Sequence, residues 1–188
     1  MEKTRVDSIT DEIYRQGGLR RMTVGLNYQT SWSLIQNASL MARVQDGAMA
    51  FESLNMIAKT CLMRNLFTTH NDWRNSGITL DFPMAPFQID ANIGWVSAVQ
   101  EMLLFSNQER IDILPACPTK WKRGEVGPLR TRCGTEVFIQ WNEETVTINI
   151  AALRDTAFTV YLPDKTSRKM NMNAGEKRRM SWSWQINR

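Results

Sequence analysis

Apolar residues recur three and four positions apart in the first part of the chain, which is the spacing of an amphipathic helix. The clearest stripe consists of Leu54, Ile57, Ala58, Cys61 and Leu62. Helices are predicted at about residues 7–16, 32–44, 48–63 and 92–106. The second and third are separated by only a few residues around Asp46-Gly47, so they must run antiparallel.

The first predicted helix has signals at both ends. Asp7 or Ser8 suits the N-terminal cap, and the pair Gly17-Gly18 is the predicted stop. By contrast, the helical period disappears between Asn65 and Gln88. Irregular stretches of this length inside a compact domain are usually functional, so this segment is predicted to line a site.

In the last third of the chain the period becomes two. Alternating apolar residues predict strands near residues 137–141, 146–150, 158–162, 170–172 and 180–184. They are predicted to form an antiparallel sheet with one buried face. The expected fold class is therefore α then β, with a helical domain at residues 1–112 and a β-domain at residues 113–188.

Composition and charge exclude several classes of partner. The chain is 43% hydrophobic and 22% charged, as globular proteins are. No apolar run is long enough to span a bilayer, so no membrane partner is predicted. The net charge of +4 arises mainly from residues 164–188, which can meet phosphate or an anionic surface. Because the basic residues 177–179 precede an alternating apolar pattern, the polar edge of a strand is the simpler interpretation, and no nucleic-acid partner is predicted.

Several catalytic chemistries have no motif in this chain. The cysteines Cys61, Cys117 and Cys133 are odd in number and widely spaced, which argues against a disulfide framework and a metal knuckle. His70 is the only histidine, so a His-based triad or a His-rich metal site would need another chain. Neither a metal nor a cofactor is predicted.

Asp90 is the candidate catalytic residue. Its spacing alone favours a helix cap, because a carboxylate accepts the unpaired N–H groups of a first turn. Its neighbours Gln88 and Asn92 point to more, since extended backbone sends Gln88 and Asp90 to the same side. Clustered polar side chains suit a hydroxyl-rich ligand, and His70 lies in the same irregular stretch. Asp90 and His70 can therefore line one cleft, with His70, Gln88 and Asn92 as the candidate substrate-binding residues, but composition alone does not decide between this cleft and a helix cap.

The segment Ala85–Gly94 resembles the PFQIDGN-F-G signature of glycoside hydrolase family 95, the inverting α-L-fucosidases and their relatives. Further motifs follow in the family's order. Residues 30–33 resemble its TGWS, 42–47 its ARL-x-DG, 65–70 its NLF-x-x-H, 101–106 its EMLLQS, 113–124 its LLPALP-x-W-x-x-G and 127–134 its GLRARGG.

The resemblance implies the last helices of an (α/α)6 toroid followed by a small antiparallel β-domain. In this family a glutamic acid protonates the leaving oxygen, and an aspartate polarises a pair of asparagines that hold the attacking water. This differs from the usual carboxylate pair. By resemblance Asp90 has the aspartate's role, and the substrate is an oligosaccharide or glycan. An amide is a poor base alone, so such support is chemically sensible.

The chain also departs from the family pattern. Ala91 and Ser31 stand where the family has glycine, Cys133 lies near a usual small residue, and residues 71–84 form a longer insertion. The general-acid glutamate, the asparagine pair and the histidine-rich HRHLSHL segment have no counterpart here. The expected protein is therefore a fragment that needs the missing N-terminal part of the same polypeptide and is inactive alone. Residues 1–5 are too polar to open a signal peptide, so the compartment stays open, an extracellular parent enzyme included.

Two alternatives remain beside the α-L-fucosidase. The parent enzyme can instead be an α-L-galactosidase or another (α/α)6 glycosidase. The chain can also be a non-catalytic carbohydrate-binding or structural module, with Asp90 serving only as a cap.

Overall fold

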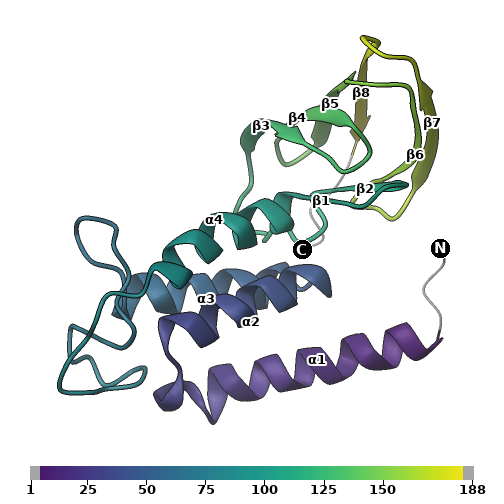
Figure 1. Ribbon diagram of the computed structural model, residues 1–188. Coiled ribbons are helices and arrows are strands. Elements are labelled where there is room, and N and C mark those ends of the chain that lie inside the picture. Colours follow the sequence, from purple (N-terminus) through teal and green to yellow (C-terminus); the bar gives the residue numbers. More distant parts are fainter. Residues whose placement is uncertain (1–4, 184–188) are drawn as a thin grey trace. The chain divides into compact units, whose positions relative to one another are not determined.

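The computed structural model describes residues 5–183 and divides the chain into two compact units, Met1–Met102 and Leu103–Arg188. The first unit is helical and the second is built from strands, as Figure 1 shows along the chain from α1 to β8. The predicted order of helices followed by a β-domain is confirmed.

The helical unit contains four α-helices and one short 3-10 helix among the described residues. They are α1 (Arg5–Thr23), η1 (Leu26–Tyr28), α2 (Ser31–Arg43), α3 (Gly47–Thr60) and α4 (Ile89–Leu103). Thr30 caps α2 through a capping box with Ser33, and Asp46 caps α3 by accepting from the Met49 N–H. Leu34, Met41 and Ile57 are completely buried where α2 packs on α3.

The prediction that α1 ends at Gly17-Gly18 is wrong, and Asp7 and Ser8 lie inside the helix rather than at its cap. A Cβ atom on Gly18 would lie 2.8 Å from Met41 Cε and 2.9 Å from Asn37 Oδ1, both on α2. The missing side chain therefore lets α1 approach α2 closely. This contact offsets the cost of about 1 kcal/mol that glycine carries inside a helix.

Helix α4 is shifted relative to its predicted range. It begins at Ile89, so Asp90 lies in its first turn rather than before it. It ends at Leu103, whereas the apolar period predicted helix to residue 106. Residues 104–106 form strand β1 instead, because Leu104 and Phe105 pair with Ile113 and Asp112 of the next strand. Pairing within this β1–β2 hairpin overrides the helical pattern of the apolar residues.

The absence of a side chain at Gly94 allows α4 to pack closely against α2. Replacing Gly94 tests this packing. A Cβ atom there would lie 2.8 Å from Ile35 Cγ1 and 3.2 Å from Ile35 Cγ2. Overpacking against a β-branched side chain costs about 1–3 kcal/mol, partly offset by the better helix propensity of alanine. Gly94→Ala is therefore expected to lower the urea midpoint of unfolding. Ser97→Ala, at an exposed position of the same helix, is the control and is expected to leave it unchanged or higher.

Up to residue 183, where the described residues end, the β unit contains two four-stranded sheets. The strands are β1 (Leu104–Ser106), β2 (Arg110–Ile113), β3 (Gly124–Arg130), β4 (Thr135–Trp141), β5 (Thr145–Ala152), β6 (Thr156–Tyr161), β7 (Ser167–Met172) and β8 (Lys177–Ser183). One sheet has the order β1-β2-β6-β7 and the other β3-β4-β5-β8. The alternation in β4 and β5 is as predicted, with Val137, Ile139, Ile148 and Ile150 buried on one face.

The expected antiparallel pairing holds for every pair of adjacent strands in the described part of the β unit except β2 and β6, but the strands form two sheets rather than one. After β5 the chain turns at residues 153–155 and β6 joins the other sheet, where it runs parallel to β2. β8 then returns to pair antiparallel with β5, with Ile148 opposite Met180. Alternation tells which side chains are buried but not which strand is the neighbour. Trp184, predicted to extend the last strand, lies outside the described residues.

Candidate functional site

The irregular segment before α4 folds into short extended pieces that meet at the first turn of that helix. Thr69 forms an antiparallel bridge with Phe87, and Leu62 forms one with Thr68. The Gln88 N–H donates to the Thr68 carbonyl at 2.8 Å, and the His70 N–H donates to the Pro86 carbonyl at 2.7 Å. The chain therefore reaches Asp90 along a fixed extended path.

Gln88 connects this path to the start of α2. Its side-chain Oε1 accepts from Ser31 Oγ at 2.7 Å and from the Trp32 N–H at 3.0 Å. The amide therefore satisfies an N–H group of the first turn of α2 that has no partner within the helix. The carbonyl of Gln88 also accepts from Thr68 Oγ1 at 2.6 Å. Gln88 is thus a brace between two segments of the helical unit.

Asn92 fixes the loop that precedes the bridge. Its Oδ1 accepts from the Thr68 N–H at 2.9 Å and from Thr68 Oγ1 at 2.8 Å. Its Nδ2 donates to the Leu66 carbonyl at 2.6 Å. Leu66 has a φ of 66°, a conformation that L side chains rarely adopt. The three hydrogen bonds of Asn92 therefore hold a strained loop in place.

Replacing Asn92 with alanine tests this role. The change leaves the buried Thr68 N–H without its acceptor and frees the Leu66 carbonyl, while Thr68 Oγ1 keeps the Gln88 carbonyl as its acceptor, so a destabilisation of about 1–3 kcal/mol is expected. Urea unfolding of the chain measures it. Gln100→Ala removes an amide from an exposed position of the same helix and is expected to change the unfolding free energy by less than about 0.5 kcal/mol. Equal effects of the two substitutions would contradict the bracing role.

His70 contributes its backbone to the same junction, while its imidazole forms no hydrogen bond among the described residues. The Ser31 N–H donates to the His70 carbonyl at 2.9 Å. The side chain is half-buried and makes no hydrogen bond to any of residues 5–183. The imidazole can therefore donate to or accept from a ligand hydroxyl.

Asp90 is exposed in the first turn of α4. Within residues 5–183 its carboxylate accepts no hydrogen bond, so it does not cap its own helix in this conformation. A negative charge at this end of the helix is favoured by the dipole. Of the four predicted site residues, Asn92 has both atoms of its amide in hydrogen bonds and Gln88 has its Oε1 in two, whereas the side chains of Asp90 and His70 form none among residues 5–183.

Exposed aromatic and aliphatic side chains surround this junction. Trp32, Phe67 and Phe87 are 43%, 51% and 53% exposed, and the rings of Phe67 and Phe87 lie 4.9 Å apart. Along α4, Ile93 and Val96 are 65% and 69% exposed. Several exposed apolar side chains near one junction favour an interaction surface or a ligand-binding groove there.

The structure adds residues that sequence reasoning did not single out. Ser31 and Thr68 are buried partners of Gln88 and Asn92. Arg43 and Glu101 form a two-pronged ion pair between α2 and α4, with Nη2–Oε1 at 2.7 Å and Nε–Oε2 at 2.9 Å. The hydrogen bond to Glu101 raises the pKa of Arg43, and its negative charge adds to this. Ser31, Arg43 and Glu101 all lie inside the family motifs described above, so the motifs could have identified them from the sequence.

The cysteines show no sign of catalytic reactivity. All three are free, and burial raises the pKa of each thiol, that of Cys117 to about 12. A thiol with a raised pKa is a poor nucleophile at neutral pH. Among residues 5–183 no group of three His, Cys, Asp or Glu side chains could hold a metal ion. No helix within these residues has the length and apolarity needed to cross a bilayer.

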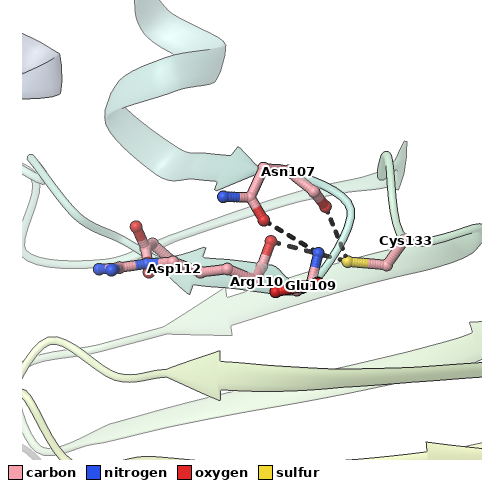
Figure 2. A network of polar contacts seen from close by, with 5 residues as sticks. All are labelled: Asn107, Glu109, Arg110, Asp112 and Cys133. Atoms are coloured by element: carbon pink, nitrogen blue, oxygen red, sulfur yellow. Dashed lines mark hydrogen bonds and ion pairs between the residues drawn. The ribbon is translucent and has the colours of Figure 1, made fainter. Parts of the chain in front are cut away.

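Cys133 has a structural role in the β unit. Figure 2 shows its sulfur directed at the turn between β1 and β2. Sγ donates to the Asn107 carbonyl at 3.0 Å, and Asn107 Oδ1 accepts from the Glu109 N–H at 2.9 Å. Beside them, Arg110 Nε donates to Asp112 Oδ1 at 2.6 Å. The network therefore fixes the turn between β1 and β2.

Comparisons with known proteins identify the family that the chain resembles. A family model described as glycosyl hydrolase family 95 catalytic domain matches residues 8–103, and one described as glycoside hydrolase family 95, C-terminal domain, matches residues 105–187. The chain is 35% identical over 124 residues to alpha-L-fucosidase 2 of Arabidopsis thaliana, which covers 60% of the chain and 13% of that protein.

Two fungal proteins are also similar. The probable alpha-fucosidase A of Aspergillus niger is 27% identical over 155 residues, covering 77% of the chain and 18% of the relative. That of Aspergillus oryzae is 30% identical over 135 residues, covering 64% and 17%. The chain thus spans less than a fifth of the length of these relatives.

Proposed function

Because the chain belongs to glycoside hydrolase family 95, we propose that it supplies the C-terminal helices and the β-domain of an enzyme that hydrolyses terminal α-L-fucosyl linkages with inversion. The fucosidase names of the three relatives support the sugar. The observation that carries the proposal is the carboxylate of Asp90, exposed and uncommitted on a rigidly braced turn.

In the proposed mechanism Asp90 acts on the groups that hold the attacking water. A carboxylate that accepts the N–H of an amide increases the electron density on the amide oxygen, which then receives the proton of the water more readily. The turn must be held still for this, because a displacement of about 1 Å can cost about 100-fold in rate. Gln88 and Asn92 supply that rigidity through the Gln88 Oε1 and both amide atoms of Asn92. This favours positioning for Asn92, whereas the Nε2 of Gln88 has no partner among residues 5–183 and can still donate to substrate.

His70 is the proposed contact to the sugar. Its imidazole is uncommitted among the described residues, and its backbone is tied to Ser31 and Pro86 beside the path to Asp90. The general acid and the water-holding asparagines are proposed to come from the remainder of a longer polypeptide. The small share of the relatives that the chain spans supports this, as do the exposed Ile93 and Val96 of α4.

The experiment that tests the sugar uses the full-length enzyme that contains these 188 residues. Release of 4-nitrophenol from the α-L-fucoside is compared with release from the α-L-galactoside, which carries a hydroxyl on C6 where fucose has a methyl group. Proton NMR of a fresh reaction identifies the first anomer formed. Preference for the galactoside would favour the α-L-galactosidase alternative, and initial formation of the α-anomer would contradict inversion.

A further inference from the structure

The outer face of the sheet β3-β4-β5-β8 contains a groove of about 330 Å³. Its lining includes Glu136 and Phe138 of β4, Asn149 and Ala151 of β5, and Lys177 and Arg179 of β8. These side chains alternate with the buried Val137, Ile139, Ile148 and Ile150, which face the core. The groove belongs entirely to the β unit and is independent of Asp90.

Strand register explains the shape of the groove. Phe138, Asn149 and Arg179 form one row across three strands, and Glu136, Ala151 and Lys177 form the next. The small side chain of Ala151 leaves a hollow between its larger neighbours. At the β3 edge, a Cβ atom on Gly127 would lie only 3.0 Å from Phe138 Cδ2, so the ring lies against backbone that carries no side chain.

The charges of the groove do not cancel. Glu136 is paired with Arg130, with Nε–Oε1 at 3.2 Å, and Arg178 is paired with Glu176, with Nε–Oε1 at 2.6 Å. Lys177 and Arg179 are both exposed, and neither has an acidic partner among residues 5–183. Two unpaired cations therefore stand beside an aromatic ring and the free amide of Asn149.

We propose that this groove binds an anionic oligosaccharide, one that carries uronate carboxylates or sulfate esters. The ring of Phe138 offers an apolar face to the C–H groups of a sugar ring. The amide of Asn149 can both donate to and accept from hydroxyls. Lys177 and Arg179 supply charge-assisted hydrogen bonds to a carboxylate or sulfate. The volume is at the lower end of the range of ligand pockets, about 300–1,000 Å³.

The same features disfavour nucleic acid. Affinity for a duplex depends on neutralising several phosphates along a cationic track. Here the next row of the same face consists of Gln140, Thr147 and Ser181, which are uncharged, and the last two share a hydrogen bond of 2.7 Å. The positive charge is thus confined to one end of the sheet, beside the aromatic ring.

Isothermal titration calorimetry of the full 188-residue chain tests the proposal. The probes are tetragalacturonate, a sulfated galactose tetramer, a neutral galactose tetramer and inorganic sulfate. One or both charged tetramers are expected to bind at least about tenfold more tightly than the neutral tetramer and than sulfate. The charged tetramer that binds more tightly shows whether the groove prefers a uronate or a sulfate ester.

Variants inside and outside the groove test which side chains bind the charged tetramer. Lys177→Gln with Arg179→Gln is expected to weaken binding of the charged tetramer at least about tenfold. Lys165→Gln with Lys169→Gln removes two exposed cations outside the groove and is expected to leave affinity unchanged. Phe138→Leu keeps an apolar side chain without the aromatic face and is expected to weaken binding severalfold, with thermal unfolding confirming that the fold persists.

Several outcomes would overturn the proposal. These are no binding of either charged tetramer, equal binding of the neutral tetramer, or equal losses in the two lysine-containing double variants. If inorganic sulfate bound as tightly as the charged tetramers, the groove would be a binding site for the anion alone and not for the sugar. Tighter binding of a DNA oligonucleotide than of the charged tetramers would assign it to another class of ligand.

Discussion

Replacing Asp90 with asparagine in the full-length enzyme is expected to lower kcat by about 10²–10⁴-fold, the usual contribution of positioned acid–base chemistry. Asparagine has the shape of aspartate but no negative charge, so it cannot increase the basicity of an amide that holds water. Because Asp90 makes no hydrogen bond within residues 5–183, the substitution removes only its interaction with the dipole of α4, about 0.3–1 kcal/mol, and is expected to change the melting temperature of the chain only slightly. Loss of rate with little loss of stability separates catalysis from capping.

Asp81→Asn is the matched control for this prediction. Asp81 is an exposed carboxylate in the same irregular segment, and it too makes no hydrogen bond among the described residues. Its replacement is expected to leave kcat unchanged. If Asp90→Asn also left kcat unchanged, the catalytic role would fail and the non-catalytic module would become the better interpretation.

The 188-residue chain alone is expected to release no fucose above the level of its own Asp90→Ala variant. Four helices cannot close an (α/α)6 toroid, and the family's general acid has no matching motif in this chain. The exposed Ile93 and Val96 of α4 would then remain in contact with water. The assay uses 4-nitrophenyl α-L-fucoside, with the full-length enzyme as the positive control.

The outcome that contradicts this expectation is also informative. Turnover by the isolated chain that disappears in Asp90→Ala would mean that the chain contains its own general acid. Glu101 would not be the first candidate, because its carboxylate is engaged by Arg43 in two hydrogen bonds. Turnover that persists in Asp90→Ala would indicate a contaminating enzyme.

The two proposals fail independently. The groove of the β unit is tested by binding of charged tetramers, and its residues are far along the chain from Asp90. Loss of kcat in Asp90→Asn says nothing about that groove. Conversely, loss of tetramer binding in the Lys177 and Arg179 variant is expected to leave hydrolysis of a small fucoside unchanged, because that substrate carries no anionic group.

Much of the fold could be predicted from local pattern. The stripe that contains Leu54 and Ile57 identified α3, and the alternation around Ile139 and Ile148 identified two adjacent strands with their buried faces. Both depend on interactions between neighbours in the chain. The errors occurred where contact with another element decides the conformation. Gly18 stays helical because α2 lies against it, and Leu104 is a strand residue because it pairs with Ile113.

The site divides in the same way. The sequence motifs identify the family without any structure, and they place Asp90 among polar residues beside a helix start. The folded chain is needed to see which of those side chains are already engaged in hydrogen bonds. Gln88 bonds to Ser31, 57 positions away, and Asn92 bonds to Thr68, 24 positions away. A hydrogen bond across such separations depends on how the whole unit packs, so no local pattern could show that the two amides brace the turn while the carboxylate of Asp90 stays free among the described residues.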